Sequence, residues 1–140
     1  MLMHLGYLHK CESYILRNST QFDELQYSRQ PDEGKYRHGT FVTLSCSSGP
    51  VVEGKDKTVC NNGKWQEPLG RCPYMCNVAV LWVTRHFLPD RVTPPQTKND
   101  WQKHLAQRVG KCYNRYNGKT DSITFTCQDG YWDPIVVCPQ

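Results

Sequence analysis

Cysteine and histidine are the residues of this chain whose types could do chemistry. There are eight cysteines and five histidines in 140 residues, and cysteine either binds a metal ion or pairs into a disulfide. Structural zinc sites use cysteine pairs that are separated by two to four residues. Only Cys72 and Cys76 approach this spacing, with three residues between them, and no His-x₃₋₅-His pair follows. The spacing therefore argues against a metal site and favours disulfides.

The cysteine count also bears on the compartment. Eight is an even number and a high one for a cytosolic chain of this length, so we expect paired cysteines and a secreted, extracellular protein. Only 38% of the residues are hydrophobic, which is too little for one large core, and each disulfide that closes a loop of tens of residues would contribute about 3–4 kcal/mol. Asn18-Ser19-Thr20 is an N-glycosylation sequon, which predicts a glycan on Asn18 of a secreted glycoprotein.

Other function classes find little support in the sequence. No Gly-x-Ser-x-Gly elbow, phosphate-binding glycine loop or His-Glu-x-x-His motif occurs, so we expect a protein that is not an enzyme and needs no cofactor. No run approaches the roughly 20 apolar residues of a membrane span. The opening, MLMHLGYLHK, is too short and too polar for the apolar part of a signal peptide. Any secretion signal is therefore expected to have been removed or to lie outside this sequence.

The cysteines fall into two similar sets. Successive cysteines are 35, 14 and 12 positions apart in the first set and 36, 15 and 11 apart in the second. This is an internal repeat of about 65 residues, which predicts two tandem modules. The predicted parts are an N-terminal extension, a first module, a linker and a second module, at residues 1–10, 11–72, 73–75 and 76–138.

Each set carries signals for short β-strands that are closed by a tight turn. The run Phe-Val-Thr-Leu at residues 41–44 leads into Cys46 and predicts a strand. A turn that needs positive φ at its central residues suits the Asn-Gly and Asp-Gly pairs that follow the third cysteine of each set. A tryptophan follows each turn, and we expect it to fill the small core beside the disulfides. The turn and tryptophan of each module are Asn62-Gly63 with Trp65 and Asp129-Gly130 with Trp132.

The segments YRHGTFVTLSC and TVCNNGKWQEPLGRC resemble the complement control protein module, also called the sushi domain. The resemblance implies a small, disulfide-rich, all-β fold that occurs twice in tandem. Spacing alone leaves three connectivities open for each set of four cysteines. The family pairs its first cysteine with its third and its second with its fourth. The disulfides implied are Cys11–Cys60, Cys46–Cys72, Cys76–Cys127 and Cys112–Cys138.

The second module departs from this pattern. It has a long insert at residues 82–110, and the run QRVGKC before Cys112 lacks the strand signal that precedes Cys46. Within the insert, Asp100 can cap a short helix that Gly110 would end. The apolar residues at positions 101, 105 and 109 would share one face of that helix.

Long modules of this kind are similar to the control-protein-like modules that parasitic nematodes secrete, among them mimics of transforming growth factor β and inhibitors of interleukin-33 and its receptor. The run EGKYRHGTFVTLSC carries this narrower resemblance. It implies an immunomodulator that binds a host cytokine or cytokine receptor and blocks or mimics its signalling. The alternatives are a complement regulator that binds complement fragments and an adhesion module that binds a glycosaminoglycan.

The charged and aromatic residues indicate where a partner would bind. Residues 76–138 carry eight Lys or Arg against five Asp or Glu, whereas residues 11–72 carry eight of each. A basic insert is compatible with heparan sulfate, but aromatic residues mixed with arginine are typical of protein-binding hot spots. We therefore expect the surface at residues 82–108 and at the junction 73–75. The candidate residues are Trp82, Arg85, His86, Phe87, Arg91, Trp101, Lys103, His104, Arg108 and Tyr74.

Overall fold

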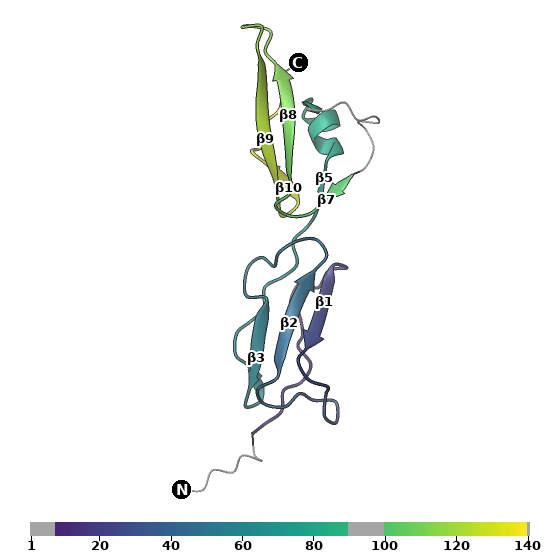
Figure 1. The fold of residues 1–140 in the computed structure, drawn as a ribbon, viewed down its shortest axis with the longest axis vertical. Helices are drawn as coiled ribbons and strands as arrows, with labels where there is room; N and C mark the ends of the chain where they lie inside the picture. The colour runs from purple at the N-terminus through teal and green to yellow at the C-terminus, as the bar shows by residue number, and fades with distance from the viewer. Residues whose placement is uncertain (1–7, 90–99, 140) are drawn as a thin grey trace. The chain divides into compact units, whose positions relative to one another are not determined.

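The computed structural model describes residues 8–89 and 100–139 (Figure 1). The chain separates into two compact units, Met1–Cys72 and Pro73–Gln140. Each unit is built on antiparallel β-strands, so the expected all-β, disulfide-rich fold is confirmed. The chain has four disulfides, two in each unit. Within a unit they join the first cysteine to the third and the second to the fourth, which is the connectivity that the resemblance implies. They are Cys11–Cys60, Cys46–Cys72, Cys76–Cys127 and Cys112–Cys138.

The first unit is a four-stranded antiparallel sheet in the order β1-β2-β3-β4. The predicted strand before the second cysteine is present as β2, and its alternating apolar side chains Val42 and Leu44 are buried in the core. This alternation places one face of the sheet inward and leaves the other exposed. The strands are β1 (Asp23–Tyr27), β2 (Phe41–Cys46), β3 (Lys57–Asn61) and β4 (Lys64–Trp65).

Trp65 lies at the centre of the aromatic packing in the first unit. Its indole N–H donates to the carbonyl oxygen of Glu12 at 2.9 Å. Tyr27 and Tyr36 stack beside it, with ring centroids 3.8 Å apart and nearly parallel planes. Burial, with a smaller contribution from Tyr27, raises the pKa of the Tyr36 phenol above its ordinary value. The tryptophan therefore serves the core, as the sequence predicts.

The second unit has a main sheet in the order β10-β9-β8-β6 and a separate pair, β5-β7. Trp132 on β10 is 1% exposed, and its indole N–H donates to the carbonyl oxygen of Asn77 at 2.9 Å. Phe87 and Phe125 pack edge to face within the same core. The strands are β5 (Cys76–Asn77), β6 (Leu88–Pro89), β7 (Trp101–Gln102), β8 (Gln107–Tyr113), β9 (Thr120–Gln128) and β10 (Tyr131–Asp133).

The helix expected from Asp100 to Gly110 is wrong. That stretch contains β7 and the first part of β8, and β8 pairs with β9 along its full length of seven residues. The run before Cys112 is therefore a strand after all. Gly110 lies within it, and a Cβ added there would meet the Cε2 of Phe125 and the Cβ of Phe87 at 3.0 Å. The second unit does contain a short helical piece, the five-residue turn η2 (Val80–Thr84), at the start of the insert.

The two hairpin turns match the sequence prediction. Asn62 and Gly63 connect β3 to β4 with φ of 48° and 90°. Asp129 and Gly130 connect β9 to β10 with φ of 50° and 99°. Positive φ at both central residues is what Asn-Gly and Asp-Gly pairs favour. In the described part of the chain, no helix is long and apolar enough to span a membrane.

Candidate functional site

Arg85, a candidate contact residue, is an internal residue of the second unit. Its guanidinium donates to the carbonyl oxygens of Trp132 at 2.8 Å and Pro134 at 2.9 Å, and its own carbonyl accepts from the Cys138 N–H at 2.8 Å. The side chain is only 9% exposed, and this burial lowers the pKa of the guanidinium below its ordinary value. Arg85 holds the C-terminal segment in place and is removed from the candidate surface.

Phe87 is a second correction to the candidate set. It is 2% exposed, because its ring packs edge to face on Phe125 with centroids 4.9 Å apart. Trp82, five positions earlier in the chain, is half-buried and packs against the same cluster. These two aromatic residues therefore belong wholly or partly to the core of the second unit, where the insert folds back on β9.

His104 lies in a turn that occurs once in each unit. Its Nδ1 accepts a hydrogen bond from the Asp129 N–H at 3.0 Å. In the first unit, the Nδ1 of His38 accepts from the Asn62 N–H at the same distance. Both histidines stand eight residues before the second cysteine of their unit. This position supports the hairpin turn in each unit, so His104 has a structural role whether or not it contacts a partner.

The exposed candidates Trp101 and Lys103 lie in one short segment, residues 101–105. Trp101 is 58% exposed, and Lys103 is also exposed. Leu105, which the sequence placed on a helix face, is 49% exposed. The residues between them, Gln102 and His104, are only partly exposed. We call Trp101, Lys103 and Leu105 the 101–105 row.

The remaining candidates are scattered over the second unit. Tyr74 is 56% exposed, and its N–H donates to the Asp129 carboxylate at 2.8 Å. His86 is exposed with φ of 64°, and the half-buried Arg108 donates to the carbonyl oxygen of Gln107, its neighbour in the chain. Arg91 lies outside the described residues.

A groove at the β8–β9 hairpin is a surface that the sequence did not single out. It encloses about 380 Å³ beside the Cys112–Cys138 disulfide. Tyr116 is fully exposed there and Tyr113 is 56% exposed. No spacing rule predicts this groove, because its residues come from the hairpin, from β9 and from the C-terminal segment. Its apolar lining includes Tyr113, Tyr116, Ile123, Val136 and Val137.

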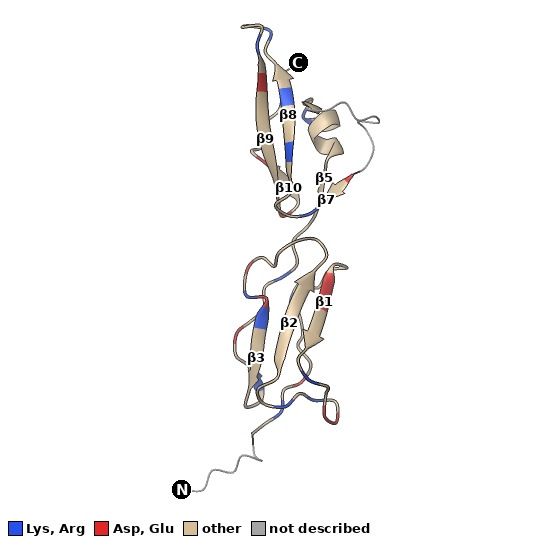
Figure 2. Cartoon of the chain, in the orientation of Figure 1, with Lys and Arg blue, Asp and Glu red and all other residues tan. Residues whose placement is uncertain are grey.

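Figure 2 marks the positions of the charged residues in the two units. In the first unit, Asp32 accepts from Lys10 at 3.0 Å and from Arg37 at 2.9 Å. In the second unit, the side chains of Lys103 and Arg115 make no ion pair with any described residue. Exposed cations without a partner of their own are available to an acidic surface.

The comparisons with known proteins bear on the family. The model of the sushi repeat (SCR repeat) matches residues 18–72, and the second unit repeats the disulfide pairing of that segment. The protein belongs to the sushi family. Sushi modules are non-catalytic binding modules, and within the described residues no group of three or more His, Cys, Asp or Glu side chains is placed to hold a metal ion.

Several known proteins are similar over most of this chain. The alarmin release inhibitor of Heligmosomoides polygyrus is 30% identical over 88% of the chain and 52% of its own length. The coagulation factor XIII B chain of Mus musculus is 44% identical over 73% of the chain and 12% of its own. Complement factor H of Mus musculus is 26% identical over 74% and 8%. The chain thus spans about half of the nematode relative and a small part of the others.

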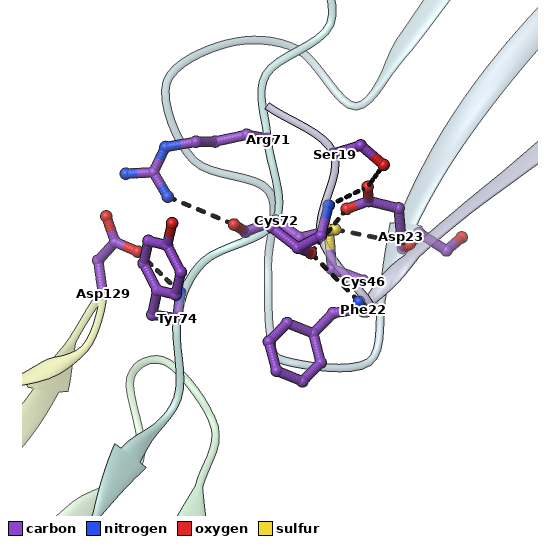
Figure 3. The surroundings of a disulfide bond; sticks show 10 residues. Ser19, Phe22, Asp23, Cys46, Arg71, Cys72, Tyr74 and Asp129 are labelled. Carbon is purple, nitrogen blue, oxygen red and sulfur yellow. Dashed lines mark hydrogen bonds between the residues drawn. A yellow bond between two sulfur atoms is a disulfide. The ribbon is translucent and has the colours of Figure 1, made fainter. Parts of the chain in front are cut away.

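The sequon lies on the surface of the first sushi module. Asn18 is exposed in a turn, and the hydroxyls of Ser19 and Thr20 donate to the carboxylate of Asp23 at 2.8 and 3.0 Å. Figure 3 shows Ser19 and Asp23 beside the Cys46–Cys72 disulfide. The turn is thus tied to the start of β1, with the Asn18 side chain open to solvent.

Proposed function

We propose that this sushi protein is a secreted, non-enzymatic immunomodulator that binds a host cytokine or cytokine receptor and blocks or mimics its signalling. The observation that carries the proposal is the similarity to the alarmin release inhibitor, which extends over 88% of the chain and so includes both modules. The name of that relative states an action on an alarmin. The ligand proposed here is accordingly a cytokine of the alarmin class or the receptor of such a cytokine.

The 101–105 row supports a protein as the ligand. It combines an exposed tryptophan, a lysine without an ion pair among the described residues, and an exposed leucine. Large aromatic and apolar side chains, flanked by charge, supply most of the binding energy at protein interfaces. The groove at the β8–β9 hairpin is the rival surface within the same module.

The test is a binding assay of the oxidised protein against a panel of alarmin cytokines, their receptors and complement fragments. We expect a dissociation constant in the nanomolar range for one cytokine or receptor. Trp101→Ala should weaken that binding at least about tenfold, while the thermal unfolding midpoint changes little because the side chain is exposed. Tyr116→Ala is the matched variant for the groove and should leave binding unchanged.

Two outcomes would redirect the proposal. Loss of binding with Tyr116→Ala and not with Trp101→Ala would move the contact surface to the groove. Binding to complement fragments alone would favour a complement regulator, the second candidate, which the similarity to complement factor H supports. The absence of any binding to cytokines and receptors would refute the immunomodulator.

A further inference from the structure

One turn occurs at the same place in both modules, and its hydrogen bonds are the same. In the first module, the Thr40 N–H donates to the carbonyl oxygen of Arg37 at 3.0 Å. In the second, the Ala106 N–H donates to the carbonyl oxygen of Lys103 at 3.0 Å. Each is a four-residue turn whose first central residue is the histidine described above. The turns begin nine residues before the second cysteine of their module.

The second central residue of this turn has positive φ in both modules. In the first module it is Gly39, with φ of 89°. In the second it is Leu105, with φ of 75°. A turn with positive φ at this position normally carries glycine or asparagine, and a bulky side chain there is an outlier that costs free energy. The second module thus has a leucine where the backbone conformation favours a glycine.

The backbone around Leu105 is fixed by contacts that do not involve its side chain. Its N–H donates to the carbonyl oxygen of Cys127 at 2.7 Å, and the Cys127 N–H donates to Ala106 at 2.8 Å. Gly39 makes the corresponding bond to Cys60 at 2.8 Å. Because the disulfide-bonded frame imposes the turn in both modules, leucine at this position must adopt the unfavourable conformation.

The Leu105 side chain adds little to the packing of the second module. The Leu105 side chain is 49% exposed and is not a member of the core cluster of its module. A strained backbone conformation whose free-energy cost is not offset by side-chain packing is a reason to look for a function. The two other members of the row, Trp101 and Lys103, are exposed on the same segment.

We infer that Leu105 is a recognition residue, whose side chain the turn presents to an apolar pocket on the protein partner. Trp101 would cover the edge of that pocket, and Lys103, which has no ion pair with described residues, would face a carboxylate beside it. The partner is therefore an extracellular protein with an apolar pocket bordered by acidic side chains. This inference rests on the proposed function and adds to it the surface and the chemistry of the partner.

The two modules supply a matched pair of substitutions. Leu105→Gly removes the side chain and gives the turn the residue that its backbone favours. Gly39→Leu places the same side chain on the equivalent turn of the first module, where an added Cβ meets nothing within 4 Å. Both variants are to be compared with the wild-type protein by thermal unfolding and by binding to the cytokine or receptor identified in the panel.

We expect opposite results from the two variants. Leu105→Gly should weaken binding about tenfold while the unfolding midpoint of the second module stays the same or rises. Gly39→Leu should leave binding unchanged and lower the midpoint of the first module by about 4–8 °C. Raised salt should weaken wild-type binding more than binding of Lys103→Gln, because the lysine is inferred to face a carboxylate.

The outcomes separate this inference from the proposed function. Unchanged binding of Leu105→Gly to the partner of the wild-type protein would overturn the recognition role and leave the immunomodulator standing. A fall of several degrees in the midpoint of Leu105→Gly would also overturn it, since the side chain would then serve the fold. A wild-type protein that binds no member of the panel would refute the proposed function and the inference together.

Discussion

The two sushi modules of this chain have the same frame but differ in what they add to it. In each, the third cysteine pairs with the core tryptophan across a hairpin, Cys60 with Trp65 and Cys127 with Trp132. In each, the indole N–H donates to the carbonyl of the residue after the first cysteine. The repeated features are the ones that close the module around its disulfides. We therefore attribute these repeated features to folding and not to the binding of a partner.

The differences lie in the segment between the first and second cysteines. In the first module, Gly39 occupies the turn before the second cysteine, and Asp32 forms ion pairs with Lys10 and Arg37. The second has the turn η2, a buried arginine and an exposed leucine at the equivalent turn. The comparison teaches that a feature present in one module alone needs its own explanation. For Arg85 this explanation is internal, and for Leu105 we have proposed a partner.

The largest expected effect concerns the core tryptophans. Trp132 is 1% exposed, so Trp132→Ala should lower the free energy of unfolding of the second module by about 3–5 kcal/mol. Trp65 is only half-buried, so Trp65→Ala should cost the first module roughly half as much. Urea denaturation followed by hydrogen exchange separates the two modules. The exposed Tyr131→Ala is the control on the same strand, and equal costs for the two tryptophans would contradict their different burial.

A smaller effect is expected for Arg85, which has no counterpart in the first module's frame. Arg85→Met keeps the length of the side chain but leaves the carbonyl oxygens of Trp132 and Pro134 without their donor. We expect a loss of about 2–3 kcal/mol in the free energy of unfolding of the second module. Arg37→Met, which removes an exposed ion pair from the first module, should cost about 1 kcal/mol or less. Similar losses from the two substitutions would place Arg85 among surface charges.

Some parts of the structure could be predicted from the sequence, and others could not. The strand before Cys46 and both hairpin turns were predictable, because residue types fix them locally. The helix from Asp100 was a wrong prediction, because apolar spacing cannot reveal that β9 offers β8 a full-length partner. The burial of Arg85 was hidden for the same reason. A position-by-position alignment of the two halves would have placed Leu105 opposite Gly39.

The shared histidines test how far the two modules are equivalent. His38→Ala and His104→Ala each leave the N–H of a hairpin turn without its acceptor, and each should cost about 1 kcal/mol in its own module. Asparagine has a carbonyl oxygen near the position of Nδ1, so the His→Asn variants should recover part of the loss. Chemical denaturation of the four variants measures both effects. A loss in one module alone would show that only one histidine supports its turn.

The smallest effect expected is a pH dependence that only the first module should show. Hydrogen bonds from Lys10 and then Arg37 hold the pKa of the Asp32 carboxyl below its ordinary value. A carboxyl with a lower pKa in the folded state stabilises that state above the unfolded-state pKa, about 4, and this contribution is lost as the pH falls through the folded-state value. Asp32→Asn should therefore lower the urea midpoint of the first module slightly at pH 6, and the difference from the wild-type protein should disappear near pH 2. The second module should unfold at the same midpoint in both proteins at each pH. A difference that persists unchanged at pH 2 would mean that the charge of Asp32 is not what stabilises the first module.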